Sequence, residues 1–179
     1  MGPRAEQERG VARFEESVLP HMDSAYNLAR WLTRNGHDAE DLVQESLLRA
    51  FQAFQGFRGT DGRAWLLAIV RNACYTWLRR NRQQEVTTEF DEEVHTLEGD
   101  ALNPEKLVLR EVDSARVRQA LEELPAEFRE VLVLREMEGL SYKEIGTVVD
   151  IPVGTVMSRL ARARGRLQRG LTSRPGEER

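Results

Sequence analysis

The sequence is nearly free of the residues that hold metals or form disulfides. Cys74 is its single cysteine, which excludes an internal disulfide and a zinc site built from several cysteines. Its three histidines are scattered and lack the spacing of metal ligands, so we expect no metal and no other cofactor. A redox switch at Cys74 would require an accessible thiol with a lowered pKa, which nothing in the sequence indicates. We interpret Cys74 as an ordinary cysteine of a helix.

Long apolar segments are also absent. The longest apolar run, at residues 64–70, is far shorter than the roughly 20 residues that cross a bilayer. The first ten residues, MGPRAEQERG, lack the apolar core of a secretory signal. A chain of 179 residues with 40% hydrophobic and 31% charged residues fits one large or two small folded domains. We therefore expect a cytoplasmic protein without membrane insertion.

Negative charge is unevenly distributed. The net charge is −4, but residues 83–105 hold eight acidic residues and neither lysine nor arginine, so the rest of the chain is net positive. Residues 83–104 also lack helical or strand periodicity, and we interpret them as a flexible linker extended by self-repulsion. No strand pattern and no internal repeat is present elsewhere. The predicted fold class is all-α, with two small helical domains at residues 11–82 and 105–171, a disordered N-terminus at 1–10 and a disordered tail at 172–179.

The first domain is predicted to contain three helical stretches. Residues 11–34 keep helical apolar spacing with a break at Pro20, and Asn35-Gly36 ends that stretch. Asp38 is expected to cap the next helix, which runs to about residue 55. Thr60 or Asp61 then caps a third helix that reaches about residue 82. The apolar side chains that we place in the core are Phe14, Val18, Met22, Ala25, Ala29, Leu32, Val43, Leu47, Ala50, Phe51, Phe54, Leu66, Ile69, Val70, Ala73 and Trp77.

The third of these helices has a polar face opposite its apolar stripe. That face combines basic, amide and aromatic side chains, a mixture that suits phosphate contacts and stacking on bases. An ordinary surface face with one half-buried tyrosine would show the same pattern, so the pattern alone leaves both interpretations open. The residues of this face are Arg71, Asn72, Tyr75, Arg79 and Arg82, with Arg80 at its edge.

Residues 141–169 have the layout of a helix-turn-helix, after predicted helices at 105–124 and 126–138. Ser141 and Glu144 form a capping box that starts the first helix, Gly146 lets a second helix cross close by, and Pro152 breaks the pattern. The second helix has an apolar stripe at Val156, Leu160, Ala163 and Leu167. Its other face holds Thr155, Arg159, Arg162, Arg166 and Arg169. This layout favours a helix that enters the DNA major groove over a solvated basic face on a core helix.

Together the two domains resemble bacterial sigma factors of the extracytoplasmic-function class, over roughly residues 11–171. Three stretches carry the resemblance: DAEDLVQESLLRAF at 38–51, FRGTDGRAWLLAIVRNACYTWLRR at 57–80, and LSYKEIGTVVDIPVGTVMSRLARAR at 140–164. The resemblance implies an alternative sigma factor, without catalysis of its own, that binds promoter DNA and the β and β′ subunits of core RNA polymerase. It further implies a monomer that initiates transcription in a stress response and is controlled by an anti-sigma factor.

The resemblance also assigns candidate contact residues in three groups. The helix at 38–54 would dock on the clamp helices of the largest polymerase subunit through Asp41, Leu42, Gln44 and Glu45. The following loop, bordering a pocket for a flipped base, and the next helix would read the −10 element through Phe57, Arg58, Gly59, Thr60, Asp61, Arg71, Asn72, Tyr75 and Arg79. The helix-turn-helix would read the −35 element through Thr155, Met157, Ser158, Arg159, Arg162 and Arg164. Met157 stands where several relatives have arginine or lysine, so the −35 preference cannot be copied from them.

Two other classes of function fit parts of the sequence. A free-standing helix-turn-helix repressor would dimerise to reach two half-sites and would bind duplex DNA tightly without polymerase. The sigma-factor hypothesis predicts weak or no DNA binding by the free protein. A helical enzyme would need a phosphate loop, a metal cluster or a nucleophile–base pair. The sequence shows none of these, and the glycines of GFRGTDG at 56–62 lack P-loop spacing.

Overall fold

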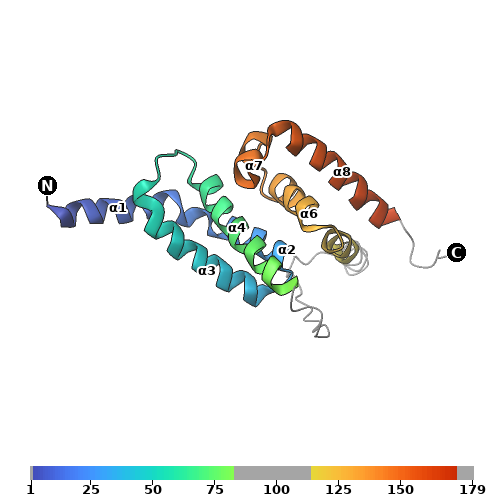
Figure 1. Ribbon diagram of the computed structural model, residues 1–179, viewed down its shortest axis with the longest axis horizontal. Helices are drawn as coiled ribbons and strands as arrows, with labels where there is room; N and C mark the ends of the chain where they lie inside the picture. The colour runs from blue at the N-terminus through green and yellow to red at the C-terminus, as the bar shows by residue number, and fades with distance from the viewer. Residues whose placement is uncertain (1, 83–113, 173–179) are drawn as a thin grey trace, which may run out of the picture.

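The computed structural model describes residues 2–82 and 114–172, and all regular structure in these residues is helical (Figure 1). This confirms the predicted all-α class. The helices fall into an amino-terminal group and a carboxy-terminal group. The predicted linker at 83–104 lies outside the described residues, as do residues 105–113 and the tail at 173–179.

The amino-terminal group comprises α1 (Pro3–Ser17), the short 3-10 turn η1 (Leu19–His21), α2 (Met22–Thr33), α3 (Gly36–Ala53), the 3-10 turn η2 (Phe54–Gly56) and α4 (Gly62–Arg82). The predicted break at Pro20 is confirmed, because η1 separates α1 from α2. The predicted disorder of residues 1–10 is not seen, since α1 is helical from Pro3. Proline is well tolerated in the first helical turn, and Arg4 pairs with Glu8 one turn later at 3.2 Å.

Helices α2, α3 and α4 enclose the core of this domain. Leu28, Leu32, Leu66, Leu67 and Val70 have no exposed surface. Aromatic rings close the end of this core near α1, where Phe14 lies edge-to-face on Phe54 with ring centroids 5.3 Å apart. Two predicted core residues lie on the surface instead, as Met22 is 39% exposed and Phe51 is 48% exposed.

Of the two helix caps predicted in this domain, one is confirmed and the other is not. The Asp61 carboxylate accepts a hydrogen bond from the Ala64 backbone N–H at 2.9 Å, which confirms it as the cap of α4. At α3 the prediction of Asp38 was wrong, because the Asn35 side chain accepts the Asp38 N–H at 3.1 Å. Arg34 has a left-handed backbone (φ 60°) that ends α2, so Asn35 is already placed to start α3.

The carboxy-terminal group comprises the helical residues 114–122, α6 (Ala126–Leu132), the π-helical turn η3 (Val133–Met137), α7 (Tyr142–Val149) and α8 (Val153–Thr172). Both hydrogen bonds of the predicted capping box are present between Ser141 and Glu144, at 2.6 and 3.1 Å. A Cβ at Gly146 would lie 2.9 Å from the Ile151 carbonyl oxygen, so only glycine fits where the turn crosses α7. Val156, Leu160 and Ala163 are buried as predicted.

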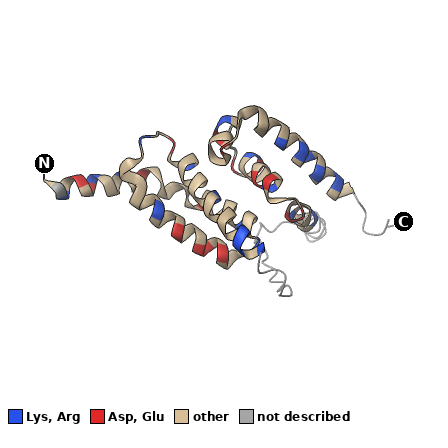
Figure 2. Cartoon of the chain, viewed as in Figure 1, with Lys and Arg blue, Asp and Glu red and all other residues tan. Residues whose placement is uncertain are grey.

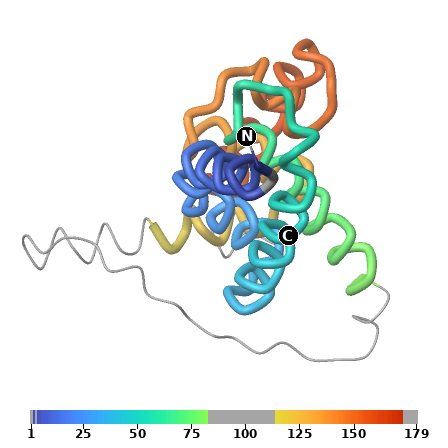
Figure 3. The backbone as a smooth tube through the Cα atoms, turned by 90° about the vertical axis from the view of Figure 1, so that its left-hand side faces the viewer, coloured from blue at the N-terminus to red at the C-terminus, as the bar shows by residue number. Residues whose placement is uncertain are grey.

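The two groups of helices pack against each other. Helix α4 lies along α7, and α2 lies against α6 (Figure 1, Figure 3). Their buried apolar residues belong to one continuous cluster. The sequence predicts two domains but not this contact, which places the predicted DNA-facing sides of α4 and α8 in different surroundings.

Candidate nucleic-acid and polymerase interfaces

Helix α8 presents most of its predicted −35 residues to solvent. Arginines follow one another along its outer side, with no acid between them (Figure 2). Met157 is 53% exposed, so an apolar side chain takes part in this surface. Arg164 donates to the Glu136 carboxylate at 2.6 Å, and these hydrogen bonds raise the pKa of Arg164. The exposed members of the predicted set are Thr155, Met157, Ser158, Arg162 and Arg164.

The loop at 57–61 is built around an aromatic anchor. The Phe57 ring lies 4.5 Å from the Trp65 ring, centroid to centroid, and is half-buried. Gly59 passes over the ring so closely that a Cβ there would lie 2.7 Å from it. Arg58, Thr60 and Asp61 remain exposed around this anchor. A hollow next to the loop is lined by Thr60, Asp61, Gly62 and Arg63, together with Glu16, Ser17, His21 and Glu144.

The polar face of α4 is divided between solvent and the carboxy-terminal domain. Asn72 and Arg79 are exposed. Arg71 instead makes two hydrogen bonds to the Glu130 carboxylate of α6, from Nε at 2.8 Å and from Nη2 at 3.1 Å. Its guanidinium also lies 4.2 Å from the centre of the Tyr75 ring. Two of the predicted −10 residues are therefore covered by the other domain.

Glu130 is a buried acidic residue between the two domains that the sequence did not single out. It has no exposed surface, and the Arg159 Nη1 of α8 lies 3.7 Å from its Oε1 atom. One carboxylate thus joins a predicted −10 residue to a predicted −35 residue. The only signal in the sequence is an acid within the apolar helix FREVLVL.

Burial and charge around Glu130 shift several pKa values. Burial raises the pKa of the Glu130 carboxyl, and the hydrogen bonds from Arg71 oppose that rise. Burial would lower the pKa of Arg71, but hydrogen bonds to Glu130 outweigh it and keep that pKa above its ordinary value. Burial and the Glu130 charge raise the pKa of Cys74 to about 12. The Cys74 thiol is buried and protonated, which supports an ordinary structural cysteine.

Helix α3 carries the candidate polymerase-contact residues on its outer side. Asp41, Gln44 and Glu45 are exposed, and acidic residues mark this side of the helix in Figure 2. Leu42 differs from its prediction, because it is 8% exposed and belongs to the core. Leu48, which is 65% exposed, extends the exposed surface one turn beyond Gln44. The exposure of Leu48 could not be predicted from the sequence, because the apolar pattern of α3 does not show which of its sides other helices cover.

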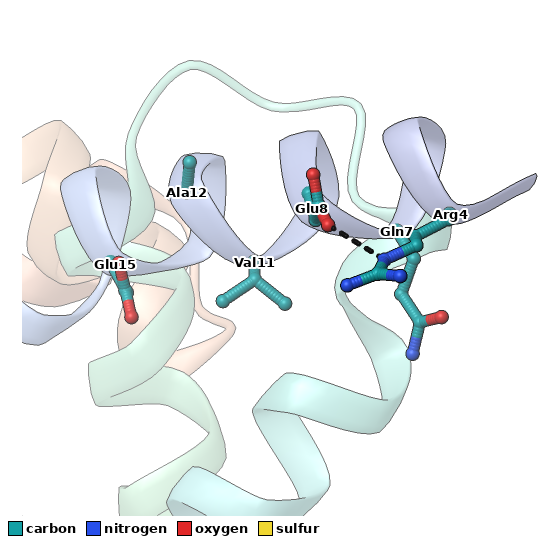
Figure 4. A pocket seen from close by; sticks show the side chains of 6 residues that line it. All are labelled: Arg4, Gln7, Glu8, Val11, Ala12 and Glu15. Atoms are coloured by element: carbon teal, nitrogen blue, oxygen red, sulfur yellow. Dashed lines mark hydrogen bonds and ion pairs between the residues drawn. The ribbon is translucent and has the colours of Figure 1, made fainter. Parts of the chain in front are cut away.

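The rest of the described surface offers little chemistry. A shallow depression along α1 is lined by residues of that helix alone (Figure 4). Arg4 and Glu8 in it already pair with each other. Within residues 2–82 and 114–172 no cluster of histidine, cysteine or acidic side chains has metal-binding geometry. In the same residues, no helix is long and apolar enough to span a bilayer.

Comparisons with known proteins find a family match in each of the two domains. Residues 18–84 match the family profile of sigma-70 region 2, and residues 114–167 match that of sigma-70 region 4. The chain is 35% identical to the ECF RNA polymerase sigma factor SigE of Mycolicibacterium smegmatis, over 92% of this chain and 63% of that protein. It is 37% identical to the RNA polymerase sigma-H factor of Pseudomonas aeruginosa, over 92% of this chain and 89% of the relative.

A solved structure is similar across both domains as well. It is the sigma factor RpoE of Bartonella quintana in complex with the anti-sigma factor NepR, at 28% identity and a TM-score of 0.73. The match covers 90% of this chain and 99% of the other. The two domain matches, the relatives and this structure agree, and the chain belongs to the extracytoplasmic-function class of the sigma-70 family.

Proposed function

We propose that this chain is an alternative sigma factor that binds core RNA polymerase and directs it to a specific set of promoters. The observation that carries the proposal is the distribution of exposed side chains over three separate surfaces. An acidic and apolar surface lies on α3, a basic one lies on α8, and the loop before α4 forms the third. A polymerase subunit needs one surface for its enzyme and others for the two promoter elements.

The surface on α3 suits docking to polymerase. Asp41 and Glu45 supply negative charge, and Leu48 supplies apolar area beside them. Interfaces gain most of their affinity from a few buried apolar or aromatic contacts, with charges at the rim setting orientation. The partner proposed for this surface is the clamp-helix region of the β′ subunit, with further contacts to β.

The surface on α8 suits the −35 element. Thr155 and Ser158 lie in its amino-terminal half, from which a recognition helix contacts base edges. Arg162 can reach a base or phosphate, and a bidentate arginine–guanine pair contributes about 1–3 kcal/mol of discrimination. Met157 offers apolar contact, which favours a thymine methyl group over a phosphate.

The loop at 57–61 and the exposed part of α4 suit the −10 element. Thr60 and Asp61 line the hollow beside the loop with hydrogen-bonding groups. A flipped base costs a few kcal/mol to unstack, and edge hydrogen bonds and stacking recover that cost. Asn72 and Arg79 lie on the adjoining face, where an amide can read a base edge and a guanidinium can hold a phosphate.

The proposed function includes no catalysis by this chain, which acts as a monomer on polymerase in the cytoplasm. An anti-sigma factor is its proposed regulator. The support comes from the Bartonella quintana relative, which was solved in complex with an anti-sigma factor. Release from such a partner under stress would make the surfaces on α3 and α8 available.

Run-off transcription tests the proposed function. Genomic fragments are transcribed by purified bacterial core polymerase with and without the protein, and we expect discrete transcripts only with it. Asp41→Lys should abolish them by reversing charge on α3, while Glu6→Lys on exposed α1 serves as the matched control and should not. If no template is transcribed and the free protein shifts the same duplexes as a dimer, the repressor alternative is correct.

A further inference from the structure

The interface between the two domains includes residues that are proposed to contact promoter DNA. Arg71 and Tyr75 of α4 lie against α6, and Arg159 of α8 is directed to the same carboxylate. We propose that the free protein closes on itself through Glu130, which occupies the arginines as a DNA phosphate would and so keeps the chain from binding promoters alone. This inference rests on the proposed sigma-factor function. We call the cluster of Glu130, Arg71 and Arg159 the domain latch.

The geometry of the latch is that of phosphate recognition. A guanidinium that makes two parallel hydrogen bonds to two oxygens of one anion is the usual arrangement for carboxylates and phosphates alike. Arg71 does this with Glu130 at 2.8 and 3.1 Å. While these bonds last, Arg71 cannot also hold a phosphate of the −10 element. Arg159 is only 22% exposed in this arrangement and lies 3.7 Å from the same carboxylate.

A second contact between the domains lies in the first turn of α4. Arg63 donates to the Glu138 backbone carbonyl at 2.6 Å and to its carboxylate at 3.0 Å. Asn27 of α2 donates to the same carboxylate at 2.6 Å. Hydrogen bonds from Ser24, Asn27 and Arg63 outweigh burial and lower the pKa of Glu138, which keeps it ionised. Glu138 thus holds the carboxy-terminal domain to α2 and α4 independently of Glu130.

The matching relative supports this closed arrangement. A TM-score of 0.73 over 90% of the chain cannot arise from one domain, because neither residues 2–82 nor residues 114–172 make up half of the 179 residues. Both domains therefore superimpose together on a sigma factor that was solved with an anti-sigma factor. In this chain, direct contacts between the domains hold them in that arrangement.

A latch of this kind is suited to opening. A buried ion pair contributes little net stability, since the attraction mostly offsets the loss of hydration. Opening returns Glu130 and Arg71 to water, and polymerase and DNA phosphates can take over the interactions of the arginine. Removing Glu130 alone has a different effect, because it leaves Arg71 buried without its anion and so favours the open form.

Energy transfer between two dyes on the free protein tests the latch directly. Glu16→Cys on α1 and Lys143→Cys on α7 place the dyes on exposed sites in different domains, next to the hollow that Glu16 and Glu144 line together. Cys74 does not compete for the dyes, because it is buried and its pKa is about 12. We expect high transfer in the parent protein and a clear loss of transfer in Glu130→Gln. Glu127→Gln, the same change at an exposed position of α6, should leave transfer unchanged.

Binding to a −35 duplex by the free protein gives a second measurement. Opening should expose Arg159, and we expect Glu130→Gln to bind about tenfold more tightly than Glu127→Gln. Glu138→Gln should also lower transfer through the second contact. If Glu130→Gln loses helical signal by circular dichroism, transfer in Arg71→Gln decides, because that change also breaks the Arg71–Glu130 pair. Unchanged transfer in folded variants overturns the latch.

The same proteins separate this inference from the function on which it rests. Transfer and duplex binding are measured without polymerase, whereas run-off transcription requires it. Loss of transfer in Glu130→Gln without transcripts from any variant would support closure and reject the sigma-factor function. Transcripts with unchanged transfer would support the function and reject the latch.

Discussion

Helices α4 and α8 both carry arginine-rich faces, and they differ in what covers those faces. On α8 Arg159 is turned toward the buried Glu130 and Arg164 pairs with Glu136 at the surface, while Thr155, Met157, Ser158 and Arg162 are exposed. On α4 both Arg71 and Tyr75 are covered by the carboxy-terminal domain, while Asn72 and Arg79 are exposed. The proposed −35 surface is therefore the less covered of the two in the free protein, whereas the proposed −10 surface is fully exposed only when the domains separate.

This difference assigns an order to the binding steps. A preformed surface loses little conformational freedom on binding, whereas a covered one must first be opened. The proposed polymerase surface on α3 is separate from the latch, so polymerase bound there would stabilise the open form without competing for the latch. In the proposed closed form, covering the −10 surface thus keeps the free protein from binding promoters without polymerase.

The largest expected effect is the difference between substituting a buried and an exposed leucine of α3. Leu42→Ala should destabilise the protein by about 2–5 kcal/mol, because Leu42 is buried in the core. Leu48→Ala should leave the free energy of unfolding nearly unchanged, since the side chain is 65% exposed, and should weaken polymerase binding instead. Urea denaturation and a polymerase pull-down measure the two properties. Equal loss of stability in both variants would contradict the assignment of Leu48 to a docking surface.

The preformed surface on α8 depends on the close crossing at Gly146. Gly146→Ala would place a Cβ 2.9 Å from the Ile151 carbonyl oxygen and should destabilise the protein by about 1–3 kcal/mol. Gly165→Ala is the matched control within α8, where the nearest atom to a new Cβ is the end of Arg169 at 3.9 Å. That change should stabilise the helix by about 0.5–1 kcal/mol. Thermal unfolding of the two variants should shift in opposite directions.

Arg162 and Arg71 sharpen the comparison between the two helices. Arg162→Ala should weaken binding of the free protein to a −35 duplex by about 1–3 kcal/mol, because Arg162 is exposed. Arg71→Ala should not weaken that binding, since Arg71 is occupied by Glu130 in the free protein. With polymerase present, Arg71→Ala should reduce open-complex formation at the −10 element. Titrations of duplex DNA with and without polymerase measure both. If Arg71→Ala weakens duplex binding by the free protein as much as Arg162→Ala does, the two faces do not differ as described.

Local chemistry explains what the sequence could predict. The amino-terminal ends of α4 and α7 are predicted by Asp61 and Ser141, whose side chains accept hydrogen bonds from backbone N–H groups three residues later. The first part of α1, residues 3–10, has no apolar pattern, and its helical form rests on residue propensity and the Arg4–Glu8 pair. Asn35 and Asp38 lie close enough in sequence that either could cap α3, and the end of α2 decides between them.

Long-range contacts explain what the sequence could not predict. Glu130 and Arg71 are 59 positions apart, and no periodic pattern links residues over such a distance. Leu42 and Leu48 are the same residue type on different sides of one helix, and Leu42 is buried whereas Leu48 is 65% exposed. Periodicity identifies the polar and apolar sides of one helix. It does not show whether a second domain covers the polar side.

The smallest expected effect concerns the first helix of the helix-turn-helix. Hydrogen bonding from the Ser141 backbone N–H lowers the pKa of Glu144 below its ordinary value of 4.5. Because the folded pKa is the lower one, the cap contributes stability above pH 4.5, and that contribution is lost as the pH falls through the folded pKa. Glu144→Gln should remove this pH dependence at a cost below about 1 kcal/mol at neutral pH.

Urea unfolding of the parent and Glu144→Gln between pH 3 and pH 7 measures this contribution as a difference, which cancels the titration of all other groups. The difference should be largest at neutral pH and should shrink toward pH 3. Glu127→Gln, in the first turn of α6 but without a capping box, serves as the matched control. A constant difference between the parent and Glu144→Gln would show that this carboxylate does not cap α7, and the arrangement of α8 would then depend on Gly146 and the buried stripe alone.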